Sequence, residues 1–385
     1  MPRLITIFKH SIIIILLVIV PQHRVWPADS LPVNIKILIG TYNKQFTMSG
    51  NRIKLTCLDS GRKPVYFAHH ILTVKREIKG ITINQEYFAG QHFRLASSGG
   101  TISLNNDNYG GAVIIECSGG KEMLLINEID LEQYLAGLIS IELSPRWELT
   151  AMKAQAVVAR TYALYQKANN SNNPYHLTTS VLYQLYRGIE HATAKTRQAV
   201  KETRGEVLTY NGLPIMAVYH SCCGGRTEDA ENVWSTNKDR PYLRSVFCGA
   251  CTGYDKYFWK LTVPRGTFYQ KLSQAGYPEY KDEESLGINR RSSTNRVLEI
   301  SIQGRSGGKA IPCNDFRSLF GFSEMRSTNF IIRETEDGYL HFLGIGNGHG
   351  VGMCQWGARI RALRGETYQD ILRHYYPGTK LERWY

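Results

Sequence analysis

Glu142 is a candidate proton-transfer residue because of its place at the end of a predicted helix. It ends a run whose apolar residues repeat at helical spacing, and the helix-breaking pair Ser144-Pro145 follows directly after Leu143. A carboxyl held near aliphatic groups at the open end of a helix resists ionisation, so its pKa rises and it can donate a proton near neutral pH. A solvated glutamate would show the same spacing, and Glu132 and Glu148 fit equally well by position alone.

Two pairs of polar side chains recur seven residues apart on the next predicted helix. Lys153 and Arg160 lie close to its apolar stripe, so these charges need partners. Gln155 and Tyr162 share another face, where a carboxamide could hydrogen-bond a sugar and a phenol ring could stack on it. Long side chains that reach solvent along their apolar stems are the alternative.

A glycine-rich loop, GlyIleGlyAsnGlyHisGlyValGlyMet, covers residues 344–353. Five glycines around His349 indicate backbone that bends sharply or approaches a neighbour closely, and they make His349 a candidate site residue. Gln355 would project from the start of the helix that follows. The spacing matches no nucleotide-binding fingerprint, and a tight structural turn is the alternative.

Four cysteines cluster in the middle of the chain: Cys222, Cys223, Cys248 and Cys251. The CxxC spacing is half of a zinc-like pattern, and His220 stands two residues before the first pair. Three states fit this spacing: a closed structural zinc site, disulfides between the two pairs, and unpaired buried thiols. The other cysteines are expected to be plain core residues: Cys57, Cys117, Cys313 and Cys354.

The elements that must position these residues follow from periodicity and capping signals. Residues 33–126 alternate short β-type runs with Gly, Asn and Ser turns, whereas helices dominate after Asp130, which can cap a helix together with Gln133. The expected elements are helices at about 131–142, from 149 to before 168 and at about 355–364, a final helix capped by Thr367 with Asp370, a hairpin around Asn211-Gly212, and strands near 297–302 and 330–332. This is an α+β fold with helices inserted among strands.

The N-terminus and the charge indicate an exported protein. Arg3 and Lys9 precede an apolar run from Ile12 to Val20, the layout of a signal peptide that we expect to end near residue 28, with an uncleaved anchor as the alternative. Without residues 1–28 the formal charge falls from +13 to +10. Outside the cytoplasm this charge favours anionic wall polymers over nucleic acid as partners, or serves solubility alone.

Internal repeats, a phosphate-binding GxxxxGK[ST] motif and heptads are absent from the sequence, which excludes solenoid, P-loop and coiled-coil classes.

Several segments, in order, resemble the stage II sporulation protein D / LytB (amidase enhancer) family. They are LeuGluGlnTyrLeuAlaGlyLeuIleSerIleGluLeuSer (131–144), GluLeuThrAlaMetLysAlaGlnAlaValValAlaArgThrTyrAla (148–163), TyrHisSerCysCysGlyGlyArgThrGlu (219–228), ProTyrLeuArgSerVal (241–246), SerThrAsnPhe (327–330), GlyHisGlyValGlyMetCysGlnTrpGlyAla (348–358) and HisTyrTyrProGlyThr (374–379). The resemblance spans about residues 35–380. Beside the strand-rich part at 29–126, it implies a catalytic core at 127–385 whose helices form a glycan-binding groove.

The resemblance implies a lytic transglycosylase of peptidoglycan, with Glu142 at the position of the catalytic glutamate. Such an enzyme acts outside the cytoplasm on strands that a partner amidase has stripped of peptides, and its catalysis requires no cofactor. The alternative is a non-catalytic wall-binding enhancer of an N-acetylmuramoyl-L-alanine amidase. The groove would be lined by Lys153, Gln155, Arg160, Tyr162, His349 and Gln355.

Two features of the sequence qualify this assignment. A cation beside Glu142 would lower its pKa and oppose proton donation, so Lys153 and Arg160 are expected to face substrate or another carboxylate. Within the C-terminal motif, Cys354 stands where the family usually has serine and Trp356 where it usually has tyrosine.

Overall fold

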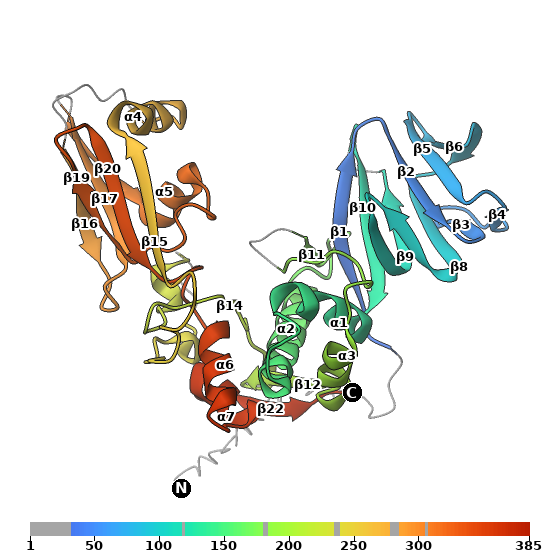
Figure 1. Cartoon of the computed structure of the whole chain (residues 1–385). Coiled ribbons are helices and arrows are strands. Elements are labelled where there is room, and N and C mark those ends of the chain that lie inside the picture. The colour runs from blue at the N-terminus through green and yellow to red at the C-terminus, as the bar shows by residue number, and fades with distance from the viewer. Residues whose placement is uncertain (1–31, 118–119, 180–183, 235–238, 278–284, 305–306) are drawn as a thin grey trace, which may run out of the picture.

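The computed structural model describes residues 32–117, 120–179, 184–234, 239–277, 285–304 and 307–385. The predicted signal peptide, residues 1–28, lies outside the described residues. A central helical body carries two domains rich in strands, which extend from it in the same general direction (Figure 1). The predicted α+β class is confirmed.

The N-terminal domain is one large, mostly antiparallel sheet. Along its strands, buried and exposed residues alternate, and Ile35 and Ile37 on the first strand are fully buried, so one face of the sheet packs on the core. The main order is β11-β1-β10-β9-β8-β2-β5-β6-β7, with β3 between β8 and β4. The strands are β1 (Asn34–Tyr42), β2 (Gln45–Gly50), β3 (Ile53–Cys57), β4 (Val65–Phe67), β5 (Ile71–Glu77), β6 (Gly80–Ile83), β7 (Glu86–Ala89), β8 (His92–Leu104), β9 (Asp107–Glu116), β10 (Met123–Asp130) and β11 (Leu177–Thr178).

Helix α1 (Leu131–Glu142) leaves this sheet without a loop. Asp130, the last residue of β10, accepts a hydrogen bond from the backbone N–H of Gln133, so it caps the helix as predicted. Helices α2 (Leu149–Asn169) and α3 (Ala194–Glu202) pack against α1, and α2 is the central helix of the body. Helix α1 is therefore joined to the sheet at its start and packed against two helices, which fixes the place of Glu142, its last residue.

The C-terminal elements complete the helical body. The predicted hairpin around Asn211-Gly212 is present, and both residues have positive φ as such a turn requires. Its first strand also pairs with the last strand of the chain. The elements are β12 (Glu206–Tyr210), β13 (Leu213–Pro214), β14 (Tyr219–His220), β21 (Met353–Cys354), α6 (Gln355–Leu363), α7 (Tyr368–Tyr375) and β22 (Lys380–Arg383), with single 3-10 turns at Ala230–Asn232 and Pro241–Leu243.

Residues between β14 and β21 form an inserted domain that the sequence analysis did not separate from the core. Its apolar residues, among them Phe268 and Phe342, form a hydrophobic cluster distinct from the main one. Two three-stranded sheets and two helices surround this cluster. The elements are β15 (Phe258–Pro264), α4 (Arg265–Gln274), β16 (Ser285–Arg291), β17 (Val297–Gly304), β18 (Gly307–Pro312), α5 (Cys313–Phe320), β19 (Phe330–Glu334) and β20 (Tyr339–Ile345).

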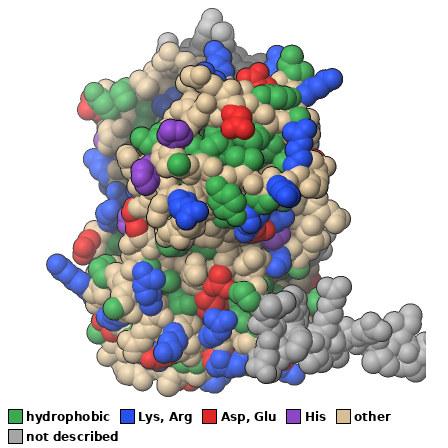
Figure 2. Space-filling model, turned by 90° about the vertical axis from the view of Figure 1, so that its right-hand side faces the viewer, with side chains coloured by type: hydrophobic (Ala, Val, Ile, Leu, Met, Phe, Trp, Pro, Cys, Tyr) green, Lys and Arg blue, Asp and Glu red, His purple; other side chains and the backbone are tan. Residues whose placement is uncertain are grey.

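The outer side of the N-terminal domain has a mixed surface. Figure 2 shows apolar side chains gathered in its upper part with Lys and Arg side chains around them. The large apolar side chains that this domain exposes are Leu58, Tyr66, Ile71, Ile78 and Tyr87. Across the described part of the chain, none of the helices has the length and apolar character needed to span a membrane.

Candidate functional site

Glu142, the last residue of α1, is half-buried and receives three hydrogen bonds from three different parts of the chain. The phenol of Tyr219 on β14 donates to its Oε1 at 3.2 Å, and the backbone N–H of Leu185 donates to the same oxygen at 3.4 Å. The carboxamide Nε2 of Gln355, the first residue of α6, donates to Oε2 at 3.3 Å. The side chain is thus held in one orientation without a neighbouring cation among these partners.

Two opposing effects set the pKa of Glu142. Burial disfavours the charged carboxylate and is the larger effect, while the hydrogen bonds from Gln355, Leu185 and Tyr219 favour it. The pKa is raised above its ordinary value. The carboxyl can therefore hold a proton at higher pH than an exposed glutamate, and the three donors are in place to stabilise the carboxylate after the proton leaves.

Gln155 and Gln355 form a second polar layer behind Glu142. The Nε2 of Gln355 also lies 3.4 Å from Oε1 of Gln155, so one amide group bridges the catalytic candidate and helix α2. Gln155 is fully buried, and its Nε2 has no hydrogen-bond partner among the described residues. The structure brings these two predicted residues together at Glu142.

His349 supports the site through the backbone. Its Nδ1 accepts a hydrogen bond from the N–H of Val351 at 3.1 Å, and its Nε2 donates to the carbonyl of Tyr219 at 2.8 Å. Burial lowers the pKa of His349 to about 4, so the ring is neutral near neutral pH and both nitrogens are used within the protein. It positions the strand that carries Tyr219 and does not itself reach Glu142.

The predicted close approach in the glycine-rich loop is present. A Cβ on Gly352 would lie 2.1 Å from the carbonyl oxygen of Val218, and a Cβ on Gly350 would lie 2.6 Å from the guanidinium of Arg296. Both glycines also have positive φ. The loop therefore packs β14 against β21 and brings Tyr219 and Gln355 to the same carboxyl.

Arg160 and Lys153 are not brought to Glu142. Arg160 is fully buried, and its guanidinium donates two hydrogen bonds to the Glu132 carboxylate, at 2.8 and 2.7 Å. Lys153 forms an ion pair with Glu202 on α3. Both cations thus face a carboxylate, which is one of the two kinds of partner expected for them. Glu132, one of the two alternative candidate acids, is paired with Arg160, and the other, Glu148, is paired with Arg359.

Tyr162 is also placed in the body of the protein. It is 5% exposed, and its hydroxyl accepts a hydrogen bond from Nε2 of Gln166 at 2.7 Å. Its ring packs in the main hydrophobic core. Gln155 and Tyr162 are both on helix α2, as predicted, but only Gln155 contacts a residue that binds Glu142.

An aromatic cluster that the sequence analysis did not identify flanks the site. Trp356 follows Gln355 directly, and its ring lies 5.5 Å from that of Trp147 and 4.9 Å from that of Tyr254. The guanidinium of Arg359 lies over both indole rings, at 5.5 and 5.0 Å, and forms an ion pair with Glu148 at 3.5 Å. In the sequence, Trp356 stands out only as a departure from the family motif. Its spacing of three residues from Arg359 on the same helix is the signal that could have predicted their contact.

Four cysteine thiols converge beside the site, and the set differs from the predicted one in one member. The Sγ atoms of Cys223, Cys248, Cys251 and Cys354 all lie within 4.8 Å of one another, and all four residues are buried. Cys354, expected to be a plain core residue, joins the cluster. Cys222 lies beside it and points its Sγ toward the carbonyl of Cys251 at 3.7 Å.

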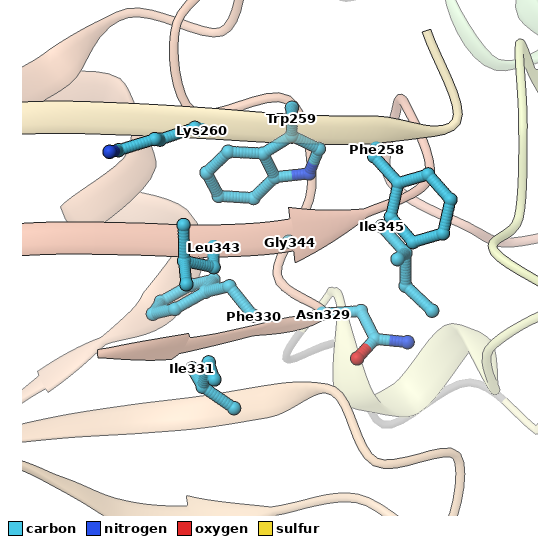
Figure 3. Close-up of a pocket in the computed structure, with 9 residues that line it drawn as sticks. All are labelled: Phe258, Trp259, Lys260, Asn329, Phe330, Ile331, Leu343, Gly344 and Ile345. Carbon is cyan, nitrogen blue, oxygen red and sulfur yellow. The ribbon is translucent and has the colours of Figure 1, made fainter. Parts of the chain in front are cut away.

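A separate pocket of about 540 Å³ lies on the inserted domain, away from Glu142. Figure 3 shows its apolar lining, with Phe258 and Trp259 on β15 and Phe330 and Ile331 on β19. Phe258 is 75% exposed, which makes this an open apolar surface. None of the residues that hold Glu142 lines it, so the proton-transfer chemistry is not placed there.

Comparisons with known proteins cover both the helical body and the inserted domain. A family described as stage II sporulation protein matches residues 119–210, and a domain family of unknown function matches residues 249–352, close to the inserted domain. An uncharacterized protein of Brachyspira hyodysenteriae is 34% identical over 73% of this chain and 74% of its own length. Stage II sporulation protein D of Bacillus amyloliquefaciens is 30% identical over 66% of this chain and 75% of its own length. The amidase enhancer of Bacillus subtilis is 29% identical over 64% of this chain and 40% of its own length.

Proposed function

The chain belongs to the stage II sporulation protein D family, and on that premise we propose that it is a lytic transglycosylase of peptidoglycan. Its substrate would be glycan strands stripped of peptides, cleaved between N-acetylmuramic acid and N-acetylglucosamine. Family membership and the names of its relatives support a role in the cell wall or in sporulation, outside the cytoplasm or at the membrane.

The observation that supports the proposal best is the setting of Glu142. A single half-buried carboxyl has a raised pKa and three neutral hydrogen-bond donors, and none of its partners among the described residues is a cation or a second carboxylate. A glycosidase that uses water needs two carboxyl groups flanking the bond. Transglycosylation with ring closure needs one that acts first as acid and then as base.

The steps follow from that arrangement. The Glu142 carboxyl protonates the glycosidic oxygen, and the bond from this oxygen to C1 of the muramic acid breaks. The Glu142 carboxylate then takes the proton from the 6-hydroxyl of the same sugar, whose oxygen bonds to C1 and closes a 1,6-anhydro ring. Tyr219, Gln355 and the N–H of Leu185 stabilise the carboxylate between the two steps.

The aromatic cluster provides the contacts that the sugar chain needs. Trp356 is half-buried, so the part of its indole that Arg359 and Tyr254 leave uncovered would stack on a pyranose face. We expect Trp356→Ala to raise KM roughly fivefold, the equivalent of about 1 kcal/mol of lost stacking, with kcat little changed. Initial rates on denuded glycan of defined length measure both constants. An unchanged KM would remove Trp356 from the binding site.

A second function is favoured by one of the comparisons. The amidase enhancer of Bacillus subtilis is 29% identical to this chain, against 30% for the sporulation proteins, and the match spans 40% of the enhancer's own length. A non-catalytic enhancer would bind peptidoglycan and accelerate an N-acetylmuramoyl-L-alanine amidase without releasing anhydro sugars. In that case Glu142 would bind glycan and not break it.

One assay separates the two functions. The purified chain without residues 1–28 is incubated with denuded glycan strands, and in parallel with intact peptidoglycan plus an amidase. Mass spectrometry of the first reaction should show products that end in 1,6-anhydro-muramic acid. If no such product forms while amide cleavage in the second reaction accelerates, the enhancer function is correct.

The pH dependence provides an independent check. Since the protonated form of Glu142 starts the reaction and its pKa is raised, kcat/KM should fall as pH rises through that pKa. Tyr219→Phe removes a donor that favours the carboxylate, so the fall should move to higher pH. Rate profiles of both proteins between about pH 4 and 9 measure the shift. A shift to lower pH would contradict the role given to Tyr219.

A further inference from the structure

The four-cysteine cluster lies at the junction between the inserted domain and the helical body. Three of its thiols precede most of the inserted domain, and the fourth, Cys354, follows it on β21. We propose that this cluster binds one zinc ion and that the bound ion holds Gln355 in contact with Glu142. The ligands are the Sγ atoms of Cys223, Cys248, Cys251 and Cys354.

The distances fit four thiolates around one ion. Zinc binds sulfur at about 2.3 Å, so the sulfur atoms of a tetrahedral site lie about 3.8 Å apart. The Sγ atoms of Cys223 and Cys251 are 3.5 Å apart, and every pair in the set is within 4.8 Å. A disulfide joins each sulfur to one partner only, whereas each sulfur here has three sulfur neighbours.

The charges around the cluster also favour a thiolate centre. Arg296 is fully buried, its Nη2 donates to the carbonyl of Cys223 at 2.6 Å, and its Nη1 has no hydrogen-bond partner among the described residues. Glu228 is a buried carboxylate nearby, but four other groups donate hydrogen bonds to it. Four thiolates with one divalent ion carry a net charge of −2, of which the single positive charge of the guanidinium offsets half, whereas two disulfides are neutral.

Backbone donors already point at one of the sulfurs. The Sγ of Cys354 accepts hydrogen bonds from the N–H of Cys223 at 3.4 Å and of Gly357 at 3.3 Å, and so it caps helix α6. Donors of this kind stabilise a metal-bound thiolate and orient it. A Cβ on Gly357 would lie 2.5 Å from the Sγ of Cys248, so this glycine leaves the space that the cluster occupies.

The metal centre would act on the catalytic candidate through the start of α6. Cys354 and Gln355 are adjacent, and Gln355 reaches both Glu142 and Gln155. Binding exchanges four thiol protons for one divalent ion and fixes the backbone of Cys354, so it also limits the positions open to Gln355. The effect on cleavage rests on the proposed function, whereas metal binding does not.

Metal content and spectroscopy test the ligand set without any measurement of activity. The full mature chain, purified without chelator, should hold one zinc per chain by elemental mass spectrometry. Replacement of zinc by Co²⁺ should give the thiolate-to-metal charge-transfer and ligand-field absorption of a tetrahedral sulfur site. Cys354→Ser should lower the retained metal about tenfold or more. Cys222→Ser, which alters a neighbouring buried thiol outside the set, should leave metal content and spectrum unchanged.

Opposite results are equally clear. If Cys222→Ser loses the ion and Cys354→Ser keeps it, the ligand set is wrong. If the purified chain holds no metal and a thiol count on denatured, non-reduced protein shows the four cysteines oxidised, the centre is a pair of disulfides and the proposal fails. In case Cys354→Ser does not fold, Cys248→Ser repeats the test at a second member of the proposed set.

The link to Glu142 has its own readout. Hydrogen exchange followed by mass spectrometry should show faster exchange in residues 355–363 after zinc removal, with little change in the N-terminal sheet. Gln355→Ala should keep one zinc per chain and still alter the pH dependence of cleavage. If zinc removal leaves exchange in α6 unchanged, the coupling is wrong even where zinc binds. If zinc binds and no anhydro product forms, only the proposed function fails.

Discussion

Glu142→Gln is expected to reduce the release of anhydro-muramic products by about 10²- to 10⁴-fold, the usual contribution of a general acid–base residue. Glutamine keeps the shape of the side chain and can accept the hydrogen bonds from Tyr219 and Leu185, but it has no proton to give to the glycosidic oxygen. Product release from denuded glycan, followed by mass spectrometry, measures the loss. Release at the wild-type rate by the variant would disprove the proposed mechanism.

Two controls separate this loss from misfolding. Glu336→Gln makes the same chemical change at an exposed position of the inserted domain and should leave cleavage unchanged. Because burial raises the pKa of Glu142, ionisation of this group weakens the folded state as pH rises through that pKa. Glu142→Gln should therefore melt at the same temperature as the wild type at low pH and no lower at neutral pH. A lower melting temperature would assign the lost activity to folding.

Local signals in the sequence were sufficient to place Glu142 at the end of a helix and to predict most of the helices, whereas the choice of Glu142 over Glu132 and Glu148 rested on the family resemblance. Asp130 and Thr367 cap the helices that they were expected to cap, and Asn211-Gly212 turns the hairpin, because each signal acts within four residues along the chain. The glycine-rich loop was correctly expected to approach its neighbours closely. The identity of those neighbours depends on tertiary packing and could not be read from spacing.

Contacts between distant residues account for what was missed. Cys354 lies 131 residues after Cys223, so its place in the thiol cluster depends on the inserted domain folding between them. That domain was not recognised, because short strands and two short amphipathic helices give weak periodicity. Glu202, the partner of Lys153, is on α3, a helix that was not predicted. The partners of polar residues on a buried helix are therefore the least predictable part of this site.

Arg160 is a polar residue on a buried helix whose partner, Glu132, was not predicted. Its substitution is expected to have the largest effect on stability. Arg160→Met is expected to reduce the free energy of unfolding by about 3–5 kcal/mol, because it leaves the Glu132 carboxylate buried without its cation. Arg160 also donates to the carbonyl of Glu206, at 3.2 Å, so it joins α2 to β12 as well as to α1. Urea unfolding followed by circular dichroism measures the change.

A matched variant and a double variant distinguish a structural role from substrate binding. Lys153→Met removes the other cation of the same helix, but its ion pair is partly exposed, so the expected loss is below about 1 kcal/mol. Glu132→Leu combined with Arg160→Met removes both charges and should be more stable than Arg160→Met alone, since no buried charge is left unpaired. If Arg160 instead bound the glycan, Arg160→Met would raise KM and leave the urea midpoint unchanged. Because the guanidinium is fully buried against Glu132, we expect the opposite result, a lower midpoint with an unchanged KM in the protein that remains folded.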